Sequence, residues 1–147
     1  MTARDRFVLT RKYVIELDAI KAKLSEHGED WRPEGVKANE VSDPTGNQAA
    51  YNIDVLGDVI EQLRARETEL EEFIGQTLGL IHHVEIGLGY EYAVILDQRY
   101  IDGLEWSDVM VNGRGISRQT GNRKVSIAFD WIDSLGMTKI LAGDYEL

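Results

Sequence analysis

The chain has 147 residues, 43% of them apolar, a formal net charge of -10 and no cysteine. This composition is sufficient for one ordinary domain, or a small domain with a helical extension, and argues against wholesale disorder. The lack of cysteine excludes disulfides and thiolate metal sites and fits the reducing cytoplasm, where we expect the protein to act. No apolar run approaches the roughly 20 residues of a membrane span, and the charged N-terminal stretch lacks an apolar signal core, so neither a membrane partner nor export is expected.

The N-terminal segment has the pattern of an amphipathic helix. Apolar residues recur at spacings of three and four from Leu9 to Leu24, which predicts a helix over about 5–25. The next segment, 28–40, contains Pro33 and two glycines and shows no periodicity. It is therefore predicted to be a loop or an extended linker.

A second, longer helix is predicted from Ser42–Pro44, which combines an N-cap side chain with a proline in the first turn. Its flanks are acidic, with nine acids between residues 40 and 75 against two arginines. Its apolar residues follow a heptad pattern: Ile53, Leu56, Ile60, Leu63, Leu70, Ile74 and Ile81. This stripe can pack against the first helix or form a coiled-coil seam with a second copy. We therefore predict that residues 1–88 form a helical arm that also supports a homo-oligomer, with a dimer favoured.

Glycines punctuate the chain between Gly75 and Gly89, and the pattern does not decide which of them end helices. A further helix is predicted from about Tyr90, and Asp102–Gly103 closes it. A short helix is then predicted over Trp106–Val111, followed by a sharp turn at Asn112–Gly115, where two glycines permit positive φ angles.

The last predicted helix begins after Ser117, a good N-cap, and extends to about Leu135. Its apolar back consists of Gly121, Val125, Ala128, Ile132 and Leu135. Gly121 weakens a helix and is expected where another helix crosses closely. Residues 89–135 thus have the outline of a helix-turn-helix, and the final segment 136–147 is predicted to be a loosely held tail. The predicted fold class is all-α.

The front of this last helix has the chemistry of DNA recognition. From Arg114 to Ala128 there are four cations and no acid, although the whole chain is strongly acidic. Such a basic island is typical of contact with a phosphate backbone. The residues expected to read base edges in double-stranded DNA are Gln119, Asn122, Arg123 and Ser126. Those expected to contact phosphates are Arg114, Ser117, Arg118 and Lys124.

Catalytic and metal-binding patterns are weak by comparison. His82 and His83 stand beside Glu85, but adjacent residues of a helix point about 100° apart and make a poor pair of metal ligands. The stretch 113–121 lacks the lysine and the preceding strand of a phosphate-binding loop. We therefore expect no enzymatic activity, no cofactor and no metal.

Three stretches resemble a known family. They are Asp43–Gly46 before the acidic helix, the sequence RYIDGLEWSDV that begins at Arg99, and the capped basic helix. Together they resemble phage transcriptional regulators of the RinA/ArpU type, over about residues 41–135. The resemblance implies a C-terminal helix-turn-helix similar to sigma factor region 4, sequence-specific DNA binding and activation of late phage genes. The sequence leaves open whether bacterial RNA polymerase is a direct partner.

Two other functions remain open. A packaging component like a terminase small subunit also joins a helix-turn-helix to an oligomerising helical region. An acidic helical protein-interaction module would not bind DNA at all. A dimer fits a regulator and a ring of about eight subunits fits packaging, while salt-dependent DNA affinity separates both from the interaction module.

Overall fold

The computed structural model describes residues 1–27 and 46–146, with side chains for 1–26 and 55–146. These residues are mostly helical, which confirms the all-α class apart from one short β-hairpin. The predicted loop at 28–40 and the predicted cap at Ser42–Pro44 lie outside them. No helix in the described ranges has the length and apolar character needed to cross a membrane.

The chain divides into two compact units. The arm unit is Ile15–Glu71, and the C-terminal unit comprises Met1–Val14 together with Glu72–Leu147. Two long helices, α1 (Ala3–His27) and α3 (Gly46–Leu88), each contribute to both units. This division differs from the predicted arm of 1–88, because both ends of that segment belong to the C-terminal unit.

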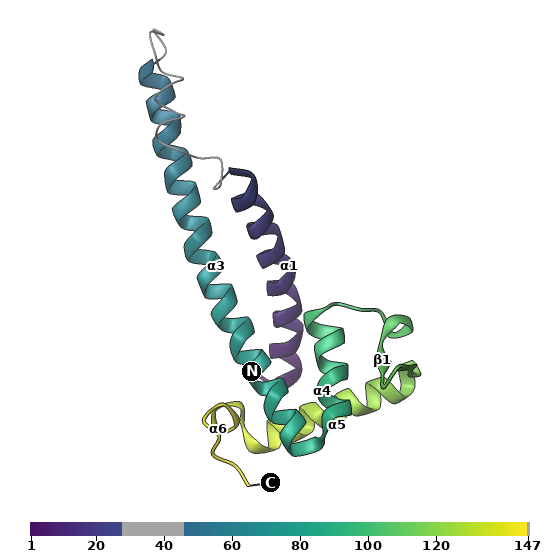
Figure 1. Cartoon of the computed structure of the whole chain (residues 1–147). Helices are drawn as coiled ribbons and strands as arrows, with labels where there is room; N and C mark the ends of the chain where they lie inside the picture. The colour runs from purple at the N-terminus through teal and green to yellow at the C-terminus, as the bar shows by residue number, and fades with distance from the viewer. Residues whose placement is uncertain (28–45, 147) are drawn as a thin grey trace. The chain divides into compact units, whose positions relative to one another are not determined.

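In the arm unit, the segments of α1 and α3 lie antiparallel along each other (Figure 1). The side chains buried in this unit are Leu17, Ile20, Leu24, Ile60 and Leu70. Ile60 and Leu70 belong to the predicted heptad, and Leu63 lies beside Ile20. Burial in a single chain therefore accounts for much of the stripe that suggested self-association. Ion pairs flank it, with Arg66 contacting Glu16 at 2.6 Å.

The first turn of α1 is fixed within the C-terminal unit. Thr2 and Asp5 form a reciprocal capping box, in which each backbone N–H donates to the other side chain at 3.1 Å. The backbone N–H of Ala3 donates to Asp133 Oδ1 at 2.7 Å. These bonds satisfy N–H groups that a helix start leaves without partners, so α1 begins at Ala3, two residues before the predicted start.

A single glycine ends α3. The helix continues through Gly75, Gly79 and Gly87 to Leu88, and Gly89 breaks it with φ 119. Helix α4 (Tyr90–Leu96) follows and continues into a π-helical turn, η1 (Asp97–Ile101). Gly103, with φ 72, then turns the chain, as the Asp102–Gly103 signal predicted.

The predicted short helix over Trp106–Val111 is wrong. Only one 3-10 turn forms, η2 (Trp106–Asp108), and a hairpin of β1 (Met110–Val111) and β2 (Arg114–Gly115) follows. Asn112 and Gly113 occupy its turn with φ 54 and 78, the geometry of a type I′ turn. Asn-Gly after β-branched residues is a strong hairpin signal, and it prevails over helix formation here. The second helix of the predicted helix-turn-helix is therefore replaced by a β-hairpin.

The last long helix, α5 (Arg118–Leu135), agrees with the prediction. Ser117 is its N-cap and accepts the Thr120 N–H at 3.1 Å. The expected back of the helix is buried, and Phe129 joins it. The loosely held tail is a wrong prediction, because α6 (Met137–Leu141) buries Ile140 completely and Tyr145 packs against Trp131.

Candidate nucleic-acid interface

Contacts with the loop before the hairpin hold the N-terminal half of α5. A Cβ added at Gly121 would overlap the Trp106 ring, so this glycine lets the indole ring lie directly on the helix backbone. Arg99 covers the same ring at 4.5 Å and donates from Nη1 to the Leu104 carbonyl at 2.7 Å. The expectation that Gly121 permits a close approach is confirmed, but the neighbour is an indole ring rather than a helix.

The hairpin is fixed to the turn that follows α4. The Gln98 side-chain amide donates to the Met110 carbonyl at 2.6 Å and accepts the Met110 N–H at 2.9 Å. This pair of bonds satisfies both polar backbone groups of one strand residue. The hairpin lies at the N-terminal end of α5 as a result (Figure 1).

The four predicted base-reading residues share the exposed side of α5. Gln119, Asn122, Arg123 and Ser126 are all exposed. Gly121, Val125 and Ala128 between them are buried in the core of the C-terminal unit. The structure therefore brings these four side chains together on one accessible face, which we call the α5 front.

The four predicted phosphate contacts are not equivalent. Arg118 is exposed in the first turn of α5, close to the α5 front. The Ser117 hydroxyl accepts the Thr120 N–H and donates to Thr120 Oγ1 at 2.9 Å, so both of its hydrogen-bonding functions serve the helix cap. Of these two residues, only Arg118 presents an uncommitted cationic side chain.

Lys124 is held within the unit. Its ammonium group donates to Glu91 Oε2 at 2.7 Å and lies 4.8 Å from the Tyr92 ring centroid. Its side chain is only 19% exposed. Lys124 and Glu91 are 33 positions apart, so no local sequence signal could have revealed this pair.

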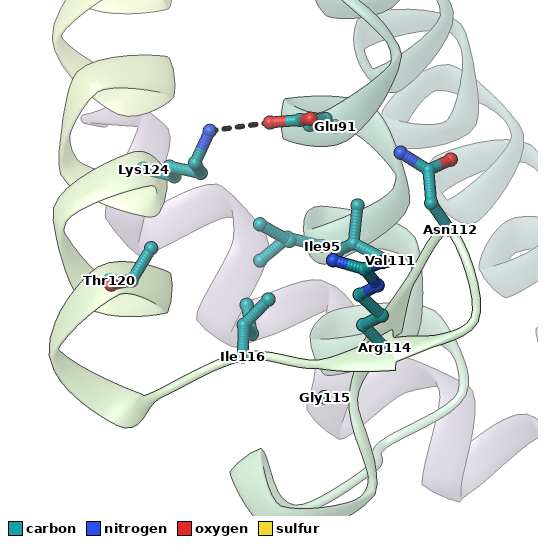
Figure 2. Close-up of a pocket in the computed structure, with 9 residues that line it drawn as sticks. All are labelled: Glu91, Ile95, Val111, Asn112, Arg114, Gly115, Ile116, Thr120 and Lys124. Carbon is teal, nitrogen blue, oxygen red and sulfur yellow. Dashed lines mark hydrogen bonds and ion pairs between the residues drawn. The ribbon is translucent and has the colours of Figure 1, made fainter.

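Arg114 is an exposed residue of the hairpin that projects to the same face as Val111. In the register of the two strands, Arg114 is opposite Val111 and Gly115 is opposite Met110. Directly opposed residues project to the same face of a β-ladder, and Val111 is buried while Met110 is exposed. The Arg114 side chain accordingly lines a pocket between α4, the hairpin and α5 (Figure 2).

The charge around the α5 front is confined to a small area. Arg118 and Arg123 have no ion pair among the described residues, whereas Asp130 and Asp133 lie toward the other end of α5. The loop before the hairpin exposes three acids, Asp102, Glu105 and Asp108. Burial, with a smaller contribution from the Asp102 charge, raises the pKa of Asp97 in the π-helical turn. The unpaired cations of α5 among the described residues thus lie in its first two turns.

The histidines take part in aromatic packing. The His83 Nδ1 is hydrogen-bonded to the Tyr145 hydroxyl, and the Tyr145 ring meets Trp131 edge-on. Among the described residues, no three potential metal ligands gather in one place. Comparisons with protein families, curated proteins and solved structures found no match to this chain.

Proposed function

We propose that the chain binds double-stranded DNA through the α5 front and acts as a sequence-specific transcriptional regulator of a phage or prophage, activating late genes. The observation that supports this most is the exposed set of Gln119, Asn122, Arg123 and Ser126 on a helix whose opposite face is core. Glutamine and asparagine side chains pair with adenine edges and arginine with guanine. The resemblance to RinA/ArpU regulators points to the same function.

The dimensions of α5 suit the major groove. A helix of 18 residues is about 27 Å long, and the groove of B-DNA admits one α-helix. Arg123 and Asn122 would face base edges, while Arg118 would meet a phosphate near the helix start, where the helix dipole also favours an anion. Lys124 would join them only if a phosphate displaced Glu91.

Self-association is part of this proposal, because a single recognition helix gives limited affinity and DNA-binding dimers use two half-sites. Since the heptad is largely buried in the chain itself, the contact would use other apolar residues of the arm unit. Ile15, Val55 and Val59 are 56%, 43% and 44% exposed. RNA polymerase is a further proposed partner, in keeping with an activator.

One observation favours the protein-interaction module as the second candidate. Asp102, Glu105 and Asp108 are exposed in the loop that leads to the hairpin, and carboxylates close to a phosphate backbone weaken DNA binding. A protein partner with its own cations would tolerate these residues. Titration at two salt concentrations discriminates the two functions, because DNA binding through phosphates weakens steeply with salt.

The test is a titration of the full chain against labelled phage and host promoter fragments at two salt concentrations. We expect one fragment to bind more tightly than random duplex. Arg123→Ala should weaken that binding by about 1–3 kcal/mol and relax discrimination at particular base pairs. Arg118→Ala should weaken all duplexes alike and lower the salt slope by about one unit.

Lys139→Ala is the matched control, because Lys139 is an exposed cation of the same unit located in α6 rather than α5. It removes the same charge and should leave the specific complex unchanged. If no fragment exceeds random duplex, or if Arg123→Ala and Lys139→Ala behave alike, DNA recognition by the α5 front is refuted.

A further inference from the structure

A pocket of about 520 Å³ lies between α4, the hairpin and the first turns of α5 (Figure 2). We propose that it binds a small organic anion, with a carboxylate or phosphate group attached to an apolar body. This site is distinct from the α5 front and does not depend on DNA binding. Its volume is within the range of small-molecule sites, about 300–1,000 Å³.

The anion would be held by Arg114. The hairpin register projects this arginine to the same side as buried Val111, and Figure 2 shows its guanidinium directed toward Val111 and Ile95. Among the described residues it makes no hydrogen bond or ion pair. Two less exposed arginines of the same unit have partners: Arg6 binds Thr77, and Arg11 binds the Ile101 carbonyl. Arg114 is a solvent-exposed cation that lines the pocket, and its five donors remain for a ligand.

The remaining charges of the pocket do not oppose an anion. Glu91 is the only acid among the described residues that line it, and the Lys124 ammonium group pairs with that carboxylate at 2.7 Å. Arg114 and Lys124 are cationic and Glu91 is anionic, so the charges that line the pocket sum to about +1. The chain as a whole has a charge of -10, so this pocket has the opposite sign to its surroundings.

The apolar body of the proposed ligand is inferred from the apolar residues at the base of the pocket. Ile95 is completely buried, Val111 is 8% exposed, and Ile116 is partly buried beside them. A hydrated inorganic ion would gain nothing from this surface, whereas an aromatic or aliphatic acid would bury apolar area against it. Thr120 also lines the pocket, and its hydroxyl oxygen accepts a hydrogen bond from the Ser117 hydroxyl.

The test uses the full chain labelled with ¹⁵N and titrated with phenyl phosphate, followed by amide chemical shifts. We expect saturable shifts confined to the amides of Ile95, Val111, Ile116 and Thr120. Benzyl alcohol, of similar size but uncharged, should bind at least about tenfold more weakly, because it cannot form charge-assisted hydrogen bonds with the guanidinium. Arg114→Gln should reduce the affinity for phenyl phosphate to the level of benzyl alcohol.

Lys139→Gln is the matched control, since it removes an exposed cation of the same unit that lies in α6 and does not line the pocket. It should leave the titration unchanged. Equal losses in the two variants, equal binding of benzyl alcohol, or no saturation would each overturn the proposal. A short duplex that shifts the same amides while phenyl phosphate does not would also overturn it, and would assign Arg114 to the DNA surface instead. The proposed DNA binding can fail without affecting these results.

Discussion

The arm unit and the C-terminal unit use their basic residues in different ways. In the arm unit, Arg66 pairs with Glu16 and Glu69, and Lys21 pairs with Glu71, at 2.6–3.3 Å. In the C-terminal unit, Arg6, Arg11 and Arg99 donate to hydroxyl or carbonyl oxygens. Arg118 and Arg123, the exposed cations of α5, have neither kind of partner among the described residues, whereas the less exposed Lys124 pairs with Glu91.

This difference distinguishes cations that stabilise the fold from cations that are available to bind a ligand. A cation paired with a carboxylate adds no net charge to its surface, and one that binds backbone carbonyls serves the fold. Arg118 and Arg123 do neither, so their charge remains for a partner. Through these two residues, an acidic chain can present a local surface suited to an anion.

The largest expected effect concerns the core of the C-terminal unit. Phe7 is completely buried, and its ring lies within 5.5 Å of the ring centroids of Tyr100 and Phe129. Phe7→Ala should lower the free energy of unfolding by about 3–5 kcal/mol, since it removes an aromatic side chain from a packed core. Urea denaturation followed by circular dichroism measures this loss. A loss below about 1 kcal/mol would show that α1 is not part of this core.

Next in size is the contact between Trp106 and α5. Gly121→Ala should destabilise the chain by about 1–3 kcal/mol, because the new methyl group would overlap the indole ring. Gly75→Ala is the matched control, since nothing lies within 4 Å of its added Cβ, and it should instead stabilise α3 by up to about 1 kcal/mol. Thermal melts of the two variants should shift in opposite directions. Shifts of the same sign would contradict the placement of Trp106.

A smaller effect on stability is expected for Asp97 in the C-terminal unit. Burial and the Asp102 charge raise its pKa, so the folded state binds its proton more readily than the unfolded state does. Its contribution to stability is present at low pH and lost as the pH rises through the folded pKa. Asp97→Asn should therefore stabilise the chain at pH 7, and this gain should disappear at acidic pH. A gain that is independent of pH would exclude ionisation as its cause.

The smallest effect on stability is expected in the arm unit, and its pH dependence has the opposite sign to that of Asp97. Hydrogen bonds from Arg66 lower the pKa of Glu16, so this pair stabilises the folded state above the ordinary Glu pKa and loses that contribution as the pH falls. Glu16→Gln should slightly weaken the arm at pH 7 and have no effect at acidic pH, where the native glutamate is also protonated. Because the pair is exposed, added salt should reduce the effect as well. An effect that grows on acidification would contradict this assignment.

Local sequence patterns determined where most helices lie. The spacing of apolar residues predicted the segments of α1, α4 and α5, and Ser117 correctly marked the start of α5. The same periodicity placed the predicted base-reading residues on the exposed side of α5, because a helix of known phase fixes which residues face outward. Such properties depend on neighbours within a few positions, so a single sequence contains them.

Tertiary structure decided what local patterns leave open. Asn112–Gly113 is a local signal for the hairpin at Met110–Gly115, but the placement of the hairpin beside α5 depends on contacts between distant positions. Gln98 pairs with the Met110 backbone, and Trp106 packs on Gly121. Gly75, Gly79 and Gly87 remain within α3, and the helix ends only before Gly89. Whether a cation is free or paired also depends on residues far apart, as Glu91 shows for Lys124. The sequence determined the helices and their faces, whereas packing between distant segments decided which of the basic residues remain available to a ligand.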